Sequence, residues 1–117
     1  MRPLCYGMAT AEEFFAIDMR VGTVLSAEPF AEARKPSIKL LIDFGSEVGQ
    51  KQSSAQLTVH YVPEQLVGRQ VVAAVNLGSR RIAGFTSEVL VLGGMTSATE
   101  VVLLNVDRPV ANGTRIG

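Results

Sequence analysis

Alternation of apolar and polar residues is clearest between Ile38 and Phe44. Every second residue of this segment is a large apolar one, and charged residues occupy two of the three intervening positions. A period of two predicts a β-strand with one buried face. A comparable pattern at 18–27 predicts the preceding strand, with Gly22 as a bulge or bend.

Further strands are predicted after these two. Segments rich in apolar residues predict strands at 70–76, 88–93 and 101–106, with a turn at 94–99 between the last two, and a short final strand is expected at 114–116. A polar segment at 50–58 predicts the third strand of the chain. The order of the strands therefore says more about the fold than any single strand does.

Two helical segments interrupt the strands. Thr10 to Glu13 has the residues of a capping box, in which a Thr hydroxyl and a Glu carboxylate each accept a backbone N–H, and it predicts a helix to about Ile17. The segment 63–68 begins with Pro and ends with Gly, which is typical of a helical turn. Residues 45–49 predict a hairpin turn.

Three strands, a helical turn and then further strands follow in the order expected of an OB barrel. The expected fold class is all-β with short helices, built as one OB-fold β-barrel domain over residues 10–117. Residues 1–9 are expected to form a disordered tail, and Met8 is an alternative start to Met1. An up-and-down barrel or small sandwich is the competing fold, but it leaves the helical turn at 63–68 unexplained.

The strand at 50–58 is unusual because Gln, Ser and Thr line one of its faces. Two explanations stay open: a polar edge that resists aggregation, and a surface that offers hydrogen bonds to a ligand. In OB barrels this strand shares the ligand face with the loops between strands 1–2 and 4–5. Those loops carry two pairs of cations, Arg34 with Lys35 and Arg80 with Arg81. The alternative, that adjacent arginines only solvate a turn, also stays open. The residues predicted to bind a peptide or RNA are Lys51, Ser53, Ser54, Gln56, Asn76, Arg80, Arg81 and Ser87.

The strands between residues 70 and 106 carry apolar residues on both faces, Val72 among the outward ones. A small barrel fills its interior with one face only, and exposed apolar surface indicates an interface. A self-complementary interface favours a two-fold dimer. We therefore predict a homodimer with the N-terminal helix and the C-terminal extension at its interface. The predicted interface residues are Phe14, Phe15, Leu90, Leu92, Val102 and Leu104.

Composition excludes several classes of function. The 11 basic and 11 acidic residues give a net charge of +0, which argues against strong non-specific binding to a polyanion. Cys5 is the one cysteine, which favours a reducing, cytoplasmic location, and with His60 as the one histidine no metal site is predicted. No stretch approaches the roughly 20 apolar residues of a membrane span, so no membrane insertion is expected. No nucleotide loop or nucleophile–base pair is present, so we predict no catalytic residue, no cofactor and no enzyme activity.

Several segments resemble the tRNA-binding domain family, whose OB-fold domains are appended to some aminoacyl-tRNA synthetases. These segments are 18–22, 61–68, 75–77, 84–87 and 112–116. Other segments resemble the CsaA branch of that family, which consists of bacterial secretion-related chaperones. These are 42–45, 51–56 and 80–94.

The resemblance implies a homodimeric OB fold that binds unfolded preproteins for export without ATP, with SecA as a partner and tRNA as a further ligand. Two departures from the synthetase-appended domains weigh against tRNA as the main ligand. Residues 32–36 replace their His-Pro-x-Ala-Asp segment, and residues 54–56 replace their Ser-Gly-Leu. Few aromatic residues are available for base stacking. The alternative is a tRNA-binding module that acts as an RNA chaperone or as a synthetase-associated factor in trans.

Overall fold

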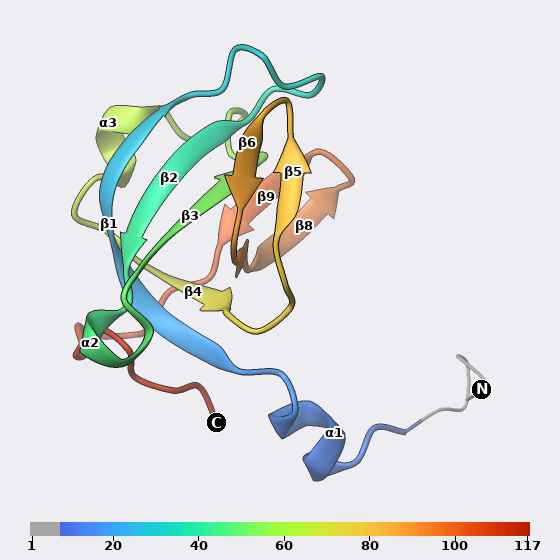
Figure 1. Cartoon of the computed structure of the whole chain (residues 1–117), viewed down its shortest axis with the longest axis vertical. Helices are drawn as coiled ribbons and strands as arrows, with labels where there is room; N and C mark the ends of the chain where they lie inside the picture. The colour runs from blue at the N-terminus through green and yellow to red at the C-terminus, as the bar shows by residue number, and fades with distance from the viewer. Residues whose placement is uncertain (1–7) are drawn as a thin grey trace.

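A five-stranded antiparallel sheet curls into a nearly closed barrel (Figure 1). The structure is a computed structural model, and it describes residues 8–117. Neighbouring strands follow the order β3-β2-β1-β4-β7. The five strands are β1 (Met19–Pro29), β2 (Ile38–Asp43), β3 (Gln50–Ala55), β4 (Gln70–Ala74) and β7 (Leu90–Val91). This mostly β barrel with short helices has the fold class predicted from the sequence.

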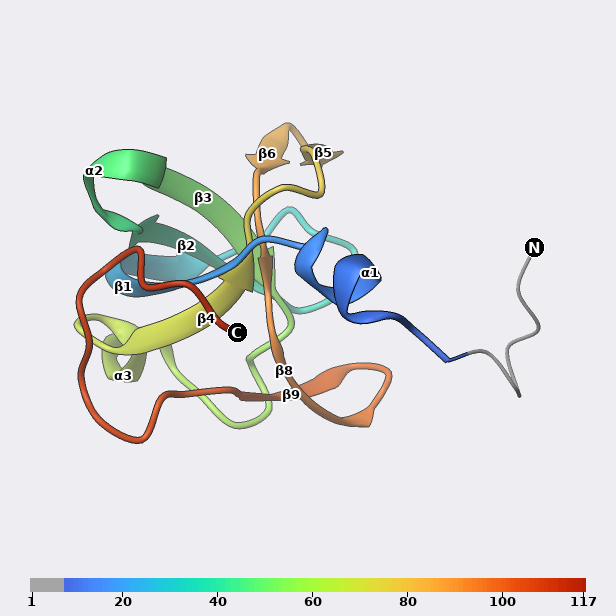
Figure 2. The same ribbon diagram turned by 90° about the horizontal axis from the view of Figure 1, so that it is seen from below.

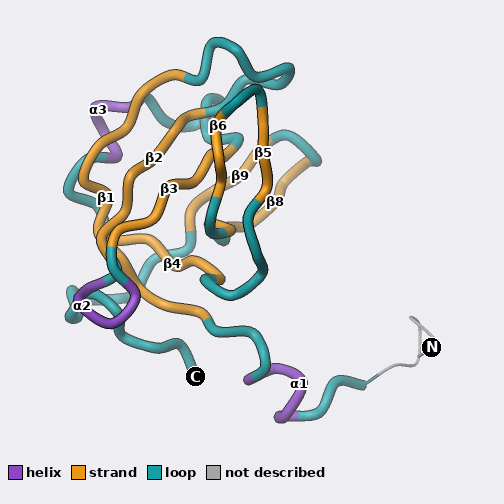
Figure 3. The backbone as a smooth tube through the Cα atoms, in the orientation of Figure 1, coloured by secondary structure: helices purple, strands orange, loops and turns teal. Residues whose placement is uncertain are grey.

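Two hairpins and three short helices surround the barrel (Figure 3). The hairpins are β5 (Arg80–Ile82) with β6 (Phe85–Ser87), and β8 (Gly93–Ser97) with β9 (Glu100–Leu103). The helices are α1 (Ala11–Phe15), α2 (Gly45–Val48) and α3 (Pro63–Leu66). Both hairpins form separate two-stranded sheets. The chain next to each one is bonded to the barrel, since the Glu88 N–H after β6 donates to the Gln52 carbonyl and the Leu92 N–H before β8 donates to the Val72 carbonyl (both 2.8 Å).

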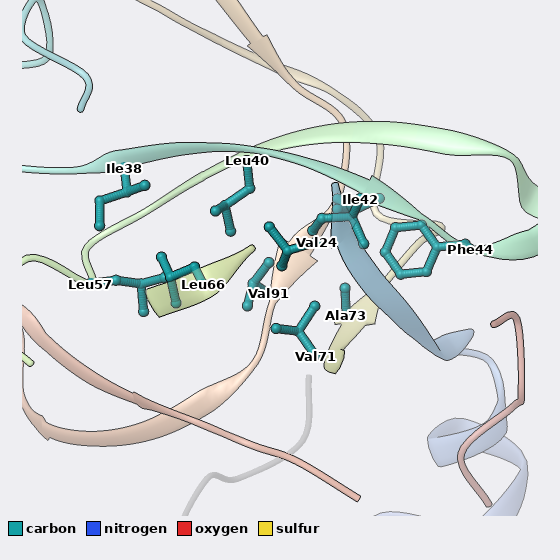
Figure 4. Close-up of a cluster of buried hydrophobic side chains, with 11 residues drawn as sticks. Val24, Ile38, Leu40, Ile42, Phe44, Leu57, Leu66, Val71, Ala73 and Val91 are labelled. Atoms are coloured by element: carbon teal, nitrogen blue, oxygen red, sulfur yellow. The ribbon is translucent and has the colours of Figure 1, made fainter. Parts of the chain in front are cut away.

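The alternation of β2 decides which of its faces is buried. Ile38, Leu40 and Ile42 are buried, whereas the residues between them are partly exposed, as predicted. Figure 4 shows these side chains pointing into one interior together with Leu57 and Leu66. Ten of the eleven residues in this core cluster are aliphatic, and Phe44 is the exception.

The barrel closes between β3 and the chain that follows β6. The backbone N–H of Glu88 donates to the Gln52 carbonyl (2.8 Å), and the Gln52 N–H donates to Oε1 of Glu88 (3.0 Å). The Ser53 hydroxyl donates to the Val89 carbonyl (2.9 Å). Side chains therefore complete the closure where a regular ladder is missing.

The segment predicted as an arginine-bearing loop is a β-hairpin instead. Ala83 and Gly84 form its two-residue turn with φ angles of 47° and 83°. Positive φ at both central residues matches the right-handed twist of the flanking strands. Because Ala seldom adopts this conformation, the sequence had no strong hairpin signal here.

Other elements also differ from the prediction. The strand expected at 88–93 divides, because Leu90 and Val91 pair with β4 whereas Gly93 begins the pairing with β9. β8 then continues through residues expected to form a turn. The expected turn at 45–49 is helix α2, and the expected strand at 114–116 is reduced to one bridge between Arg20 and Arg115.

Helix α1 stands away from the barrel in both views (Figures 1 and 2). Its predicted capping box is confirmed, since the Glu13 N–H donates to Oγ1 of Thr10 (3.0 Å) and the Thr10 N–H to Oε1 of Glu13 (2.9 Å). Arg115 donates to the Phe15 carbonyl (2.9 Å) and so ties the C-terminal segment to the helix. Most of the tail predicted at 1–9 lies outside the described residues.

Gly22 is not the bulge predicted from the sequence. The register shift of β1 lies between Val24 and Ser26, and Gly22 pairs regularly with Val71. A Cβ at Gly22 would lie 2.7 Å from side-chain atoms of both Ile42 and Phe44. Glycine is therefore required by packing against β2, not by backbone conformation.

We expect Gly22→Ala to lower the free energy of unfolding by about 1–3 kcal/mol, because the added methyl overpacks the core. Urea denaturation monitored by circular dichroism measures the change. Gly94→Ala in the exposed strand β8 is the matched control, since its Cβ would meet only an ordinary contact at 3.9 Å. Equal stability of the two variants would contradict the packing explanation.

Candidate functional site

A groove of about 760 Å³ runs along one side of the barrel. One wall is the β1–β2 loop, and the opposite wall is β5 with the hairpin turn. The end of β3 and the strands β7 and β8 line it between them. We call this feature the groove, and its lining includes Arg34, Lys35, Ser54, Gln56, Arg80, Arg81, Ile82, Leu90, Leu92 and Met95.

Half of the residues predicted to bind a ligand line the groove. Ser54, Gln56, Arg80 and Arg81 come together there from β3 and β5. The hydroxyl of Ser87 lies beside them and accepts the Ser54 N–H (3.3 Å). The polar strand β3 and the basic strand β5 therefore meet at one surface, as the order of the strands implied.

The other three predicted residues lie elsewhere. Ser53 is fully buried, and its hydroxyl is used in barrel closure. Asn76 accepts the Asp18 N–H (2.9 Å) and donates to the Ala16 carbonyl (2.8 Å), so it fastens α1 to the barrel. Lys51 is partly buried and is absent from the groove lining. A ligand in the groove would not contact Ser53 or Asn76.

Four cations line the groove, and among residues 8–117 no carboxylate pairs with them. Arg34 and Lys35 come from the β1–β2 loop, and Arg80 and Arg81 from β5. Arg81 donates only to the Thr86 hydroxyl (3.0 Å). The four cations at the rim of the groove can therefore bind carboxylates, phosphates or carbonyl oxygens by donating hydrogen bonds to them.

Apolar side chains line the groove beside this basic rim. Leu90 is 51% exposed and Met95 65% exposed. Leu90 and Leu92, both predicted for the dimer interface, are groove residues in this structure. Sequence reasoning missed Met95, because it fell in a segment expected to be a turn. The groove thus combines apolar surface with polar and cationic groups.

Aromatic residues near the groove are already occupied by other contacts. Phe30 is 3% exposed, and its ring packs edge-to-face against Phe85 at 5.4 Å. The Tyr61 hydroxyl accepts the Leu103 N–H (3.0 Å), and Arg69 lies over its ring at 5.3 Å. Single-stranded nucleic acid is usually bound by stacking on free aromatic rings. In the described part of the chain, the groove offers none.

Most residues predicted for a dimer interface are exposed. Phe14, Phe15, Val102 and Leu104 each expose at least 40% of their surface. Val72, expected to point outward, is instead buried at 5% exposure. The outer face of β4 is covered within the chain, so it cannot contribute to a dimer.

An ion cluster supports the base of the barrel away from the groove. Nε of Arg20 donates to Oδ1 of Asp18 (2.7 Å), and Nη1 donates to Oε1 of Glu47 (2.6 Å). The hydrogen bond from Arg20 is the main cause that lowers the pKa of Asp18, and partial burial opposes it. The same two bonds raise the pKa of Arg20. This cluster connects the start of β1 to α2 and to the Gly113 carbonyl (3.0 Å), and its role is structural.

Two further features of residues 8–117 bear on function. No group of three metal-ligating side chains is close enough to hold an ion. No helix in this range has the length and apolar character needed to cross a bilayer.

The sequence family can be assigned from a match that spans nearly the whole domain. A family described as putative tRNA binding domain matches residues 19–115. The chain belongs to the tRNA-binding domain family. The matched region contains the barrel, both hairpins and every residue named above as lining the groove.

Solved structures of this family confirm the likeness to the CsaA branch. The chaperone CsaA of Bacillus anthracis is 56% identical, with a TM-score of 0.89 over 95% of this chain and 100% of that chain. The CsaA chaperone of Picrophilus torridus is 41% identical, with a TM-score of 0.85 over 94% and 100%.

Curated relatives include much larger members of the tRNA-binding domain family. The methionine–tRNA ligase of Methanococcoides burtonii is 35% identical over 109 residues, which are 93% of this chain and 16% of that protein. The ligase of Thermotoga maritima is 34% identical over 107 residues, or 92% and 16%. The chain thus spans about one sixth of the length of these relatives.

Proposed function

We propose that this protein is a CsaA-like, ATP-independent chaperone that binds unfolded polypeptides, including preproteins for export, in the groove. The observation that carries the proposal is the pairing of apolar surface with hydrogen-bonding groups along one extended groove. An unfolded chain presents both kinds of group. The likeness to two CsaA chaperones over nearly the full length supports the same conclusion.

If the groove bonds the backbone of a client polypeptide, it can bind clients of many different sequences. β5 pairs with β6 on one side only. Ile82 and Phe85 flank a two-residue turn, so they form the hydrogen-bonded pair, and Arg81 belongs to the next, non-hydrogen-bonded pair. The N–H and carbonyl of Arg81 therefore point away from β6. A client strand can add to this edge, while Ser54 and Gln56 bond its other side.

The proposal extends to assembly and location. Exposed apolar side chains on α1 and β9 fit a second copy of the chain, and two grooves per dimer would raise avidity through effective concentration. On the CsaA likeness we also propose SecA as a partner, a cytoplasmic location and no enzymatic activity.

Removing the polar groups of the groove should weaken client binding. We expect the double variant Ser54→Ala with Gln56→Ala to need on the order of tenfold more protein to suppress aggregation of an unfolded client, since each net hydrogen bond contributes about 0.5–1.5 kcal/mol. Light scattering of the aggregating client measures this. Ser46→Ala, exposed on α2, is the matched control. Unchanged suppression by a folded double variant would place the client elsewhere.

A dimer should depend on the exposed apolar residues at the end of β9. We expect static light scattering to give about twice the 12.5 kDa chain mass, and Leu104→Glu to shift the protein toward the monomer by placing charge in an apolar interface. Val62→Glu is the matched control, because Val62 is equally apolar and 51% exposed before α3. A monomeric wild-type protein at micromolar concentration would overturn the proposed assembly.

RNA is the second candidate ligand, and the four cations of the groove, which form no ion pair within the described residues, favour it. If tRNA binds there, Arg80→Glu with Arg81→Glu should weaken binding. The log–log salt slope should also fall by about 0.7 for each single-strand phosphate that the variant no longer neutralises. Filter binding at several salt concentrations measures both quantities. Arg108→Glu, whose side chain is 83% exposed outside the groove, is the control. An unchanged slope in the double variant would exclude the hairpin from RNA binding.

A further inference from the structure

The ammonium group of Lys39 lies over two aromatic rings that contact each other. Its Nζ is 4.7 Å from the ring centroid of Phe30 and 5.2 Å from that of Phe85. The two rings meet edge-to-face, with centroids 5.4 Å apart and planes at 64°. We call these three residues the lysine–aromatic cluster.

The cluster joins the two walls of the groove. Phe30 follows β1 and begins the loop that carries Arg34 and Lys35. Phe85 is the first residue of β6, directly after the turn of the β5–β6 hairpin. Contact between the two rings therefore connects the tip of the hairpin to the opposite loop. Figure 1 shows the hairpin turn and the β1–β2 loop at the same end of the barrel.

Other attachments hold the hairpin closer to its base. Donors on β3 bond to this part of the chain: Nε2 of Gln52 donates to the Thr86 carbonyl (3.4 Å), the Ser54 N–H to the Ser87 hydroxyl and the Gln52 N–H to Oε1 of Glu88. A hairpin fastened only at its base could swing and change the distance between the walls. The contact at Phe85 opposes that motion.

The position of Lys39 is stabilised from its other side. Its Nζ lies 4.0 Å from Oε1 of Glu28 and 3.9 Å from Oε1 of Glu32, and its side chain is 23% exposed. The two carboxylates keep the ammonium group in place over the rings, where the ring faces attract it. Lys39 thus adds an electrostatic contact to both walls.

We propose that Lys39 and Phe85 are positioning residues that hold the β5–β6 hairpin against the β1–β2 loop and so set the width of the groove. The inference rests on the proposed function in so far as width governs client affinity. A conformational preference can change affinity by no more than its own free energy. Loss of the aromatic contact or of the cation–π contacts should therefore weaken client affinity by no more than roughly two- to tenfold.

The experiment measures groove width and client affinity in the same variants of the full chain. Spin labels at Ala31→Cys and Ala83→Cys, with Cys5→Ser, report the distance between the walls by double electron–electron resonance. The probe for affinity is a reduced, carboxymethylated polypeptide that stays unfolded. The test variants are Phe85→Leu and Lys39→Met, which keep apolar bulk. Phe85→Tyr and Lys39→Arg are the matched controls, which keep the ring or the cation.

We expect both test variants to broaden the distance distribution and to weaken polypeptide binding about two- to tenfold, while both controls resemble the wild type. Urea denaturation separates this effect from a general loss of stability, which would leave the distances of the folded state unchanged. Unchanged distances in Phe85→Leu would overturn the inference, and so would a wider groove with unchanged affinity. If the wild-type protein binds no polypeptide, the proposed function fails, and the distances alone then decide whether the cluster sets the width.

Discussion

The closure of the barrel between β3 and the chain after β6 is the constraint on which the rest of the structure depends. It uses few hydrogen bonds, and the one from the Ser53 hydroxyl to the Val89 carbonyl is fully buried. An unpaired buried carbonyl would cost about 1–3 kcal/mol. The Ser53 hydroxyl supplies the shorter of two bonds to this carbonyl, the other coming from the Ser87 hydroxyl (3.4 Å), so closure explains the serine without a ligand.

This mode of closure also creates the groove. A regular ladder along β3 would continue past Ser54 and cover the surface that a ligand could use. Instead, side chains of Ser87 and Glu88 complete the bonding of β3 at Ser54 and Gln52, and the β5–β6 hairpin stands apart as its own sheet. The polar residues of β3 thus serve two purposes: some close the barrel, and the next ones face the groove.

The two ends of the domain are linked at a site away from the groove. Asn76 and Arg115 hold the α1–β1 junction, and Arg20 connects β1 to α2 and to the Gly113 carbonyl (3.0 Å). These bonds leave the apolar side chains of α1 exposed. The proposed dimer surface on α1 is therefore separate from the groove proposed for the client.

The sequence by itself determined the parts that depend on local pattern. The period of two in β2 and the capping box of α1 were readable because each is set by neighbours in the chain. The order of the strands was enough to predict that Ser54 and Arg80 lie on the same face of the barrel, and both line the groove. Only the tertiary structure decided that Ser53 is internal, that Asn76 holds α1 to the barrel, that Val72 is covered, and that Lys39 lies over two rings in contact. Each of these depends on contacts between residues far apart in the chain, and no local pattern of polarity records which distant group a side chain will meet.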